Sequence, residues 1–149
     1  MNTKQVLYNM CQEYVNNRLE TIKSTINDIE QGLNSETKSS AGDKHETGRA
    51  MLQLEREKAG QQLAEVQKLQ ELLQKIDLEK QFTKVALGSI VETSGLNYFI
   101  AISSGELTIN DKKYYAISPV TPIAKQLLSK KVGDSIHFRS STFVINKIE

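Results

Sequence analysis

The apolar positions in the first half of the chain repeat at helical spacing. Two long runs, 2–31 and 49–80, contain no glycine or proline except Gly60. Apolar residues in both runs recur at steps of three, four and seven, which is the heptad pattern of coiled-coil helices. They are Val15, Leu19, Ile22, Ile26 and Ile29 in the first run, Leu33 just after it, and Leu52, Ala59, Leu63, Val66, Leu73 and Ile76 in the second. The runs predict an antiparallel helical hairpin, and helices of about 30 residues would be about 45 Å long.

The pattern changes after residue 80. Short runs rich in β-branched and aromatic residues, such as "NYFIAIS", "KKYYAIS" and "TFVINKI", are separated by turn signals at Gly95, Asn110-Asp111 and Gly133-Asp134. This pattern of short apolar runs and turn residues is typical of short antiparallel strands. We therefore expect an α+β protein, with a coiled-coil hairpin in residues 1–80 and a sheet of about five strands in residues 81–149.

A single short helix is predicted inside the second half. The segment "SPVTPIAKQLLSKK" offers Thr121 as the N-cap and Pro122 as the first helical residue. A threonine hydroxyl accepts a backbone hydrogen bond at the start of a helix, and proline is well tolerated at the first helical position. We expect this helix to pack on the sheet.

Composition indicates a soluble protein without a strong bias toward nucleic acid. The chain has 149 residues, 38% hydrophobic and 25% charged, with a net charge of +1. The apolar runs are too short to span a bilayer and the N-terminus lacks a signal-peptide pattern, so we expect a cytoplasmic protein with no membrane partner. The single cysteine, Cys11, cannot form an internal disulfide, and its apolar neighbours at helical spacing predict a buried thiol.

The sequence offers little for an enzyme that acts alone. Its two histidines are His45 and His137. The segment "HETGR" begins like a zinc-protease motif but has Arg49 where the second histidine is needed, and no phosphate-binding loop or serine-nucleophile motif occurs. His137 is expected to be an ordinary strand residue.

The stretch "SSAGDKHETGRA", residues 39–50, forms the expected tip of the hairpin. Asp43 and Glu46 are three residues apart, which places both carboxylates on one side of a helical turn. Such a pair can accept a hard divalent cation, but Mg²⁺ prefers six oxygen ligands, so two carboxylates make an incomplete site. This suggests donation into the active site of another protein. The alternative is structural, with Asp43 as the N-cap of the second helix and Glu46 closing a capping box.

These residues resemble a known family. "GDKHE", residues 42–46, is similar to the GD-x-x-E tip of the bacterial Gre transcript-cleavage factors, GreA and GreB. "LGSIV", "AISPVTPIAKQLLSKKVGDSIHF" and the closing "FVINKIE" resemble their C-terminal domain, so that the likeness covers nearly the whole chain.

The resemblance implies a transcription elongation factor whose partner is RNA polymerase. In that family the C-terminal domain, similar to FK506-binding proteins, docks on the polymerase, and the hairpin enters the secondary channel. Asp43 and Glu46 would help to hold a Mg²⁺ ion shared with the polymerase while backtracked RNA is cleaved. The polymerase remains the enzyme, and this protein would be a monomer that meets the 3′ end of the nascent RNA indirectly.

The tip also departs from the family. The family commonly continues "ENAEY", whereas this chain has "ETGRA" in residues 46–50. Lys44, His45 and Arg49 make the tip less negative, and they would either weaken metal capture or contact RNA phosphate. A channel-binding regulator without cleavage activity therefore stays open. So does a coiled-coil scaffold that dimerises through the hairpin seam.

The second half supplies candidate docking residues. Tyr114 and Tyr115 are adjacent in a predicted strand, so their side chains must point to opposite faces, one toward the core and one toward the surface. The basic residues Lys125, Lys130 and Lys131 are expected on or beside the short helix. We predict that these five residues contact the polymerase. For the lysines, the alternative is an ordinary solvated helix end.

Overall fold

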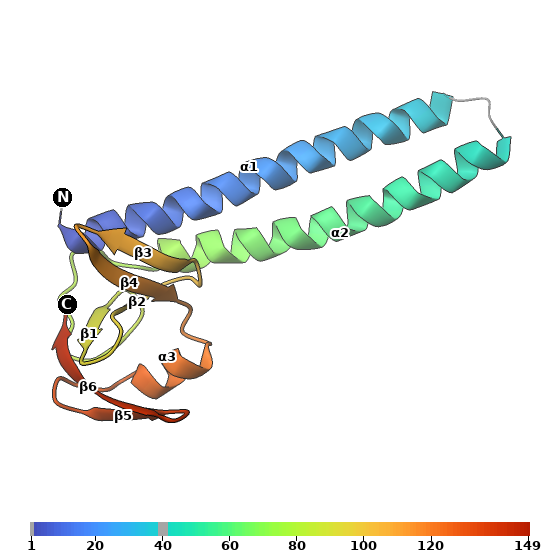
Figure 1. Cartoon of the computed structure of the whole chain (residues 1–149). Helices are drawn as coiled ribbons and strands as arrows, with labels where there is room; N and C mark the ends of the chain where they lie inside the picture. Colours follow the sequence, from blue (N-terminus) through green and yellow to red (C-terminus); the bar gives the residue numbers. More distant parts are fainter. Residues whose placement is uncertain (1, 39–41) are drawn as a thin grey trace. The chain divides into compact units, whose positions relative to one another are not determined.

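The described residues fold into two long helices, a six-stranded sheet and a short third helix (Figure 1). The computed structural model describes residues 2–38 and 42–149, and it describes side chains for residues 2–35 and 47–149. The elements within these residues are α1 (Thr3–Lys38), α2 (Gly42–Gln74), β1 (Ile90–Thr93), β2 (Tyr98–Ile100), β3 (Gly105–Ile109), β4 (Lys112–Ile117), α3 (Pro122–Leu127), β5 (Ser135–Phe138) and β6 (Ser141–Ile148). The predicted α+β class is confirmed.

Residues 15–70 form one compact unit, the hairpin unit, in which α1 and α2 run antiparallel. Every seventh residue along α1 is buried, at Val15, Ile22 and Ile29, and the same period buries Ala59 and Val66 in α2. The heptad seam predicted from the sequence is confirmed. Because these side chains are buried within a single chain, the hairpin completes its own seam.

The two helices extend farther toward the hairpin end than the pattern predicts. α1 continues to Lys38 and α2 already begins at Gly42. Residues 42–50, expected in the tip, therefore belong to α2.

The second compact unit, the sheet unit, combines residues 71–149 with the N-terminal residues up to Tyr14. Its strand order is β3-β4-β2-β1-β6-β5. All neighbours are antiparallel except β2 and β4, which pair in parallel, with Tyr98 opposite Tyr115. The predicted antiparallel sheet of about five strands is thus a mostly antiparallel sheet of six, and the parallel β2–β4 pair was not predicted. The parallel pair arises because β3 forms a hairpin with β4, which returns the chain alongside β2.

The turn between β3 and β4 has the predicted residues. Asn110 and Asp111 both adopt positive φ angles, 49° and 66°. Two such residues make the type of two-residue turn that matches the twist of antiparallel strands, and asparagine and aspartate tolerate this conformation better than most residues. The turn signal read from the sequence is confirmed.

The helix α3 begins as predicted. Thr121 precedes it with an extended backbone, and the Thr121 hydroxyl accepts a hydrogen bond from the Ala124 amide at 3.3 Å. Pro122 is the first helical residue. The cap fixes where the helix begins, and its buried residues Ala124 and Leu127 face the core.

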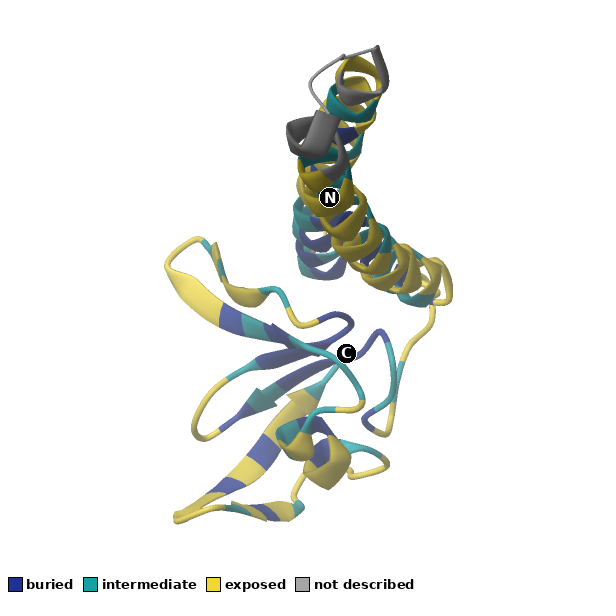
Figure 2. Cartoon of the chain, turned by 90° about the vertical axis from the view of Figure 1, so that its right-hand side faces the viewer, coloured by how far each residue is buried: buried dark blue, intermediate teal, exposed yellow. Residues whose placement is uncertain are grey.

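The main core lies where α3 meets the sheet. Leu127 packs with strand residues Val91, Tyr98, Ile100, Ile136, Phe143 and Ile145, together with Val85. Alternate residues of β6 are buried and exposed, as the changing colours along the strands show in Figure 2. This period-two pattern is expected when one face of a strand packs on a core.

The N-terminal part of α1 is buried within the sheet unit. Leu7 and Cys11 are fully buried, and the Cys11 thiol lies 3.7 Å from the Ser104 hydroxyl, in the segment between β2 and β3. The Tyr8 hydroxyl donates a hydrogen bond to the Leu73 carbonyl at 3.2 Å. The predicted burial of Cys11 is confirmed, and burial raises the pKa of its thiol. The thiol therefore stays protonated near neutral pH.

Candidate functional site

The acids singled out by the sequence belong to the first turns of α2. This helix begins at Gly42. The structure does not describe the side chains of residues 43–46, which are Asp43, Lys44, His45 and Glu46. The metal site, the capping box and the RNA contacts predicted for these side chains therefore lie outside the described residues. Their roles stay predictions.

Among the tip residues predicted to bind metal or RNA, Arg49 has a described side chain. Its guanidinium Nη1 donates a hydrogen bond to the Leu33 carbonyl at 3.2 Å, which links α2 to α1. Arg49 is half-buried, so only part of the side chain faces solvent. The residue predicted to contact RNA phosphate therefore also joins the two helices.

The helices approach closely beside this link. A side-chain carbon added at Gly32 would lie 3.1 Å from Cδ1 of Leu52, so glycine permits the contact. One turn farther from the end, Arg56 pairs with Glu30, with 3.4 Å between Nε and Oε1. Both partners are substantially exposed, so the pair contributes little to stability. The contact between Gly32 and Leu52 and the hydrogen bond of Arg49 therefore hold α1 and α2 together here more firmly than the ion pair does.

Two large apolar side chains on α2 remain exposed near this end. Met51 is 60% exposed and Leu54 is 66% exposed. They are three residues apart, so they lie on the same side of the helix. Their positions in the sequence show only that Met51 and Leu54 lie off the seam, so no sequence signal marks them as a site.

The two candidate tyrosines lie in β4. Tyr115 packs against the main core while remaining half-buried. Tyr114 points to the other face and is only 5% exposed, so the expectation that one of the pair lies at the surface was wrong. Burial raises the pKa of Tyr114, and the nearby charge of Glu149 raises it further. Its hydroxyl therefore stays protonated.

The candidate lysines are exposed but fixed at their backbones. Lys125 lies in the last turn of α3. The Lys130 carbonyl accepts a hydrogen bond from the Val85 amide at 2.9 Å, and the Lys131 amide donates one to Asp134 Oδ2 at 2.8 Å. Their charged ends are thus presented to solvent on an ordered scaffold. Their binding role stays a prediction.

His137 occupies the strand position expected for it. It lies in β5 and is exposed, and its Nδ1 is 2.9 Å from the Thr142 hydroxyl of β6. Residues 137 and 142 are direct neighbours in the β5–β6 pairing. The histidine therefore makes a cross-strand contact, as an ordinary strand residue does.

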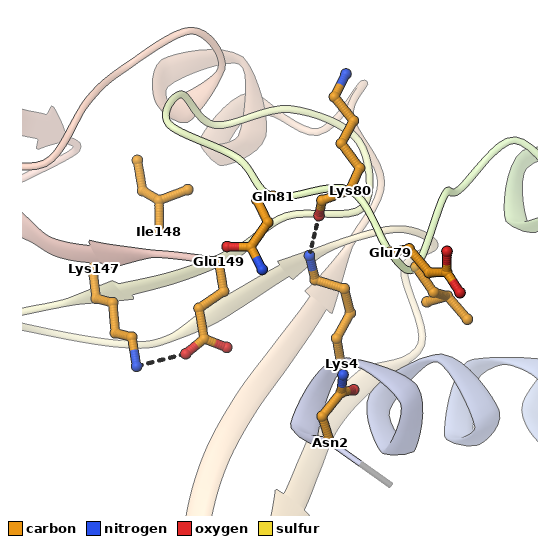
Figure 3. A pocket seen from close by; sticks show the side chains of 9 residues that line it. Asn2, Lys4, Glu79, Lys80, Gln81, Lys147, Ile148 and Glu149 are labelled. Atoms are coloured by element: carbon orange, nitrogen blue, oxygen red, sulfur yellow. Dashed lines mark hydrogen bonds and ion pairs between the residues drawn. The ribbon is translucent and has the colours of Figure 1, made fainter.

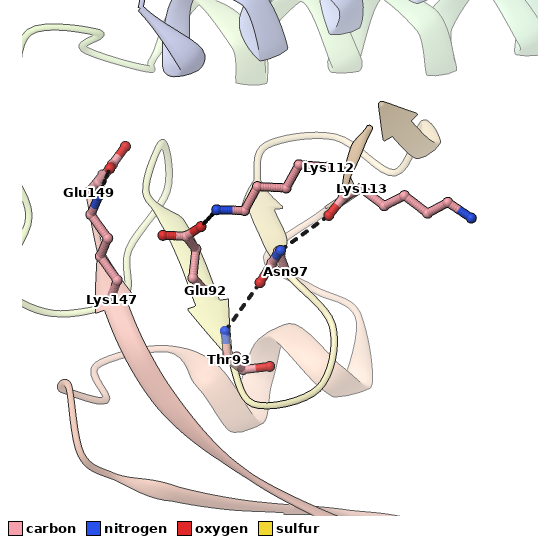
Figure 4. Close-up of polar contacts among 7 residues, drawn as sticks. All are labelled: Glu92, Thr93, Asn97, Lys112, Lys113, Lys147 and Glu149. Atoms are coloured by element: carbon pink, nitrogen blue, oxygen red, sulfur yellow. Dashed lines mark hydrogen bonds and ion pairs between the residues drawn. The ribbon is translucent and has the colours of Figure 1, made fainter. Parts of the chain in front are cut away.

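Charged side chains gather on the sheet face that bears Tyr114. Glu92 forms an ion pair with Lys112, and Lys147 forms one with Glu149 at 2.6 Å (Figure 4). The Lys112 ammonium lies 5.7 Å from the centre of the Tyr114 ring. The charges of Lys112 and Lys147 are therefore compensated locally.

A pocket that the sequence did not reveal opens in the sheet unit (Figure 3). It has a volume of about 600 Å³. We call it the Lys4 pocket, and its lining residues are Asn2, Lys4, Leu78, Glu79, Lys80, Gln81, Lys147, Ile148 and Glu149. They come from three separate chain segments, so no single motif marks the pocket.

Lys4 is an unusual residue in this pocket because only 7% of it is exposed. Its ammonium donates a hydrogen bond to the Lys80 carbonyl at 3.2 Å and lies 4.8 Å from the centre of the Phe82 ring. Burial lowers the pKa of Lys4, while the negative charges of Glu149 and Asp77 oppose this shift. The pocket therefore contains a partly desolvated cation.

No cluster of three or more histidine, cysteine, aspartate or glutamate side chains among the described residues could hold a metal ion. None of the described helices has an apolar stretch of the length that a bilayer crossing requires.

Comparison with known proteins gives little guidance. No protein-family model matches the chain, and no curated protein matches it. A solved structure described as "Structure of the transcription factor Gfh1" matches over 91% of this chain and 91% of its own, with 19% identity and a TM-score of 0.35. This likeness is too weak to assign a family or a function.

Proposed function

We propose that this protein is a Gre-like transcription elongation factor that inserts the end of its helical hairpin into the secondary channel of RNA polymerase. The observation that carries the proposal is the position of Asp43 and Glu46 at the start of α2, in the sequence "GDKHE". α1 has 36 residues and α2 has 33, so each helix is roughly 50 Å long. Helices of this length suit delivery of two acids into a deep channel.

The proposed chemistry is shared between two proteins. Asp43 and Glu46 would provide two of the oxygen ligands that a Mg²⁺ ion requires, and the polymerase and RNA would provide the others. In phosphodiester hydrolysis, a bound Mg²⁺ ion stabilises the charge that develops on the reacting oxygens. The protein would position its carboxylates, and the polymerase would remain the enzyme.

The closed seam supports a monomer over a scaffold. Val15, Ile22 and Ile29 are buried by residues of the same chain. A second chain could use this seam only if the hairpin opened and exchanged these contacts for contacts with the second chain. The opened monomer would expose apolar surface at a cost of about 25 cal/mol per Å².

A regulator that occupies the channel without promoting cleavage is the second candidate. It is favoured by the basic residues around the acids and by Arg49, whose guanidinium bonds to the Leu33 carbonyl. Positive charge beside the carboxylates would reduce their attraction for a metal ion. In this case the hairpin would still bind the polymerase.

The two candidates are separated by a cleavage assay on a backtracked complex of the cognate polymerase. We expect added protein to accelerate RNA cleavage in the presence of Mg²⁺. The double variant Asp43→Asn/Glu46→Gln should retain polymerase binding and lose this acceleration, because amides cannot replace carboxylates as strong Mg²⁺ ligands. Glu57→Gln, which changes an exposed acid farther along α2, is the matched control and should behave as wild type.

Other outcomes decide against the proposal. If the wild-type protein binds without accelerating cleavage, the channel-binding regulator is favoured. If it does not bind the cognate polymerase, both candidates fail. A stable dimer in sedimentation at several concentrations would instead favour the scaffold.

A further inference from the structure

We propose that the Lys4 pocket binds a carboxylate group through the Lys4 ammonium. All nine lining residues lie within the sheet unit, and none belongs to the hairpin end. The inference is therefore independent of the proposed role of Asp43 and Glu46.

The buried ammonium has unused hydrogen-bonding capacity. A lysine ammonium has three N–H donors. One of them meets the Lys80 carbonyl at 3.2 Å, and the Phe82 ring provides a weaker contact. Among the described residues, Lys4 makes no other hydrogen bond and no ion pair. The other two N–H groups have no acceptor among the described protein residues, so they are available to water or to an acceptor that enters the pocket.

The surrounding charges favour an acceptor with a single negative charge. Lys147 is already paired with Glu149 at 2.6 Å, and the Lys80 side chain extends away from the Lys4 ammonium in Figure 3. Among the described lining residues, Lys4 is thus a buried cation without an ion-pair partner. Glu79 and Glu149 also line the pocket, and their negative charges would repel a phosphate dianion more strongly than a carboxylate.

The remaining lining suits a carboxylate attached to an organic group. Leu78 and Ile148 offer apolar surface, whereas Asn2 and Gln81 offer amide donors. A volume of about 600 Å³ lies within the range of roughly 300–1,000 Å³ that is typical of small-molecule sites. The pocket can therefore accept either a small organic acid or an acidic side chain of a peptide. Both sources present the same group to Lys4.

The binding test uses the full-length protein with ¹⁵N-labelled lysine. The protein is titrated separately with acetate, with an end-blocked Gly-Glu-Gly peptide and with inorganic phosphate. Chloride is added to keep the ionic strength constant. We expect a saturable shift of the Lys4 side-chain resonance with acetate or the peptide. Peptide binding at least tenfold tighter than acetate would identify a protein side chain as the source. Equal or tighter binding of acetate would identify a free organic acid.

Two results would overturn the inference at this stage. One is the absence of a saturable Lys4 shift with both carboxylates. The other is phosphate binding that is tighter than both.

Charge-changing variants provide a second, independent test. Lys4→Met should weaken carboxylate binding at least tenfold. Since Lys4 is buried, this replacement also alters packing, so Glu149→Gln is the more decisive variant. It removes a competing negative charge and releases Lys147, and both effects should tighten binding several-fold. Lys125→Met changes an exposed lysine outside the pocket and should leave binding unchanged. Unchanged or weaker binding by Glu149→Gln would contradict the inference.

Discussion

Leu7 lies near the beginning of α1, is fully buried, and belongs to the compact unit that contains the sheet. We predict that Leu7→Ala destabilises the sheet unit, although Leu7 is more than 80 residues before β1 in the chain. Two hydrogen bonds motivate this expectation. They join this part of α1 to the rest of the unit, from Lys4 to the Lys80 carbonyl and from Tyr8 to the Leu73 carbonyl.

The expected loss is about 3 kcal/mol. Removing three carbon atoms from a fully buried site costs about 0.8 kcal/mol each in transfer free energy, or about 2.4 kcal/mol. The cavity left behind adds to this cost, and buried Leu→Ala substitutions commonly cost about 2.7–5 kcal/mol. The better helix propensity of alanine returns only about 0.2 kcal/mol. A domain with a stability of about 5–15 kcal/mol would remain folded under native conditions.

Native-state hydrogen exchange is a suitable assay because it reports on individual amides. Ile100 and Ala101 are fully buried, and their amides donate to the Ser89 and Ile117 carbonyls at 3.0 and 2.9 Å. If these amides exchange through opening of the unit, a loss of about 3 kcal/mol should accelerate them on the order of 100-fold. Acceleration of less than about threefold would refute the assignment of Leu7 to the sheet unit.

Two controls separate this effect from general destabilisation. Ile22→Ala creates a cavity in the hairpin seam, where Ile22 is 7% exposed, and should accelerate exchange in the hairpin while leaving Ile100 nearly unchanged. Leu54→Ala removes a side chain that is 66% exposed and should change stability by less than about 0.5 kcal/mol. Equal acceleration of Ile100 by Leu7→Ala and Ile22→Ala would show that the two units open together.

Three further predictions concern the sheet unit. Burial lowers the pKa of Lys4 below its ordinary value of 10.5. Between the lowered pKa of the folded state and 10.5, the folded state therefore binds fewer protons than the unfolded chain. The free energy of unfolding should therefore rise with pH in this window, and Lys4→Met should flatten the rise in urea titrations; an unchanged slope would contradict the burial of Lys4. Thr121→Ala removes the hydroxyl that accepts from the Ala124 amide, and it should cost about 1 kcal/mol in denaturant unfolding, whereas Thr121→Ser should cost little. Asp111→Val places a β-branched residue at a φ of 66° and should cost about 1–2 kcal/mol, while Asp111→Gly should be tolerated; equal stability of the two variants would disprove the turn conformation.

The correct sequence predictions rest on local patterns. Val15, Ile22 and Ile29 are seven residues apart, so any helix through them places them on one side. Thr121-Pro122 and Asn110-Asp111 are signals whose physical cause lies within a few residues, and the structure confirms both. Each needs no information about distant parts of the chain.

The predictions that failed depended on distant contacts. Alternation in β4 requires Tyr114 and Tyr115 to face opposite ways, but it cannot reveal that Tyr114 is covered on its own face. The parallel pairing of β2 with β4 was missed for a similar reason. Strand partners are chosen by packing over the whole sheet, and period-two patterns are identical in parallel and antiparallel strands that are buried on one face.

The sequence alone determined the helical hairpin, the α+β class and the cap of α3. Periodicity and capping act over one or two turns, so they can be read from neighbouring residues. Only the tertiary structure decided the strand order, the burial of Leu7 and the Lys4 pocket. A lysine in a helix ordinarily faces water, and Lys4 is buried because residues 78–82 from the middle of the chain and 147–149 from its other end fold around it.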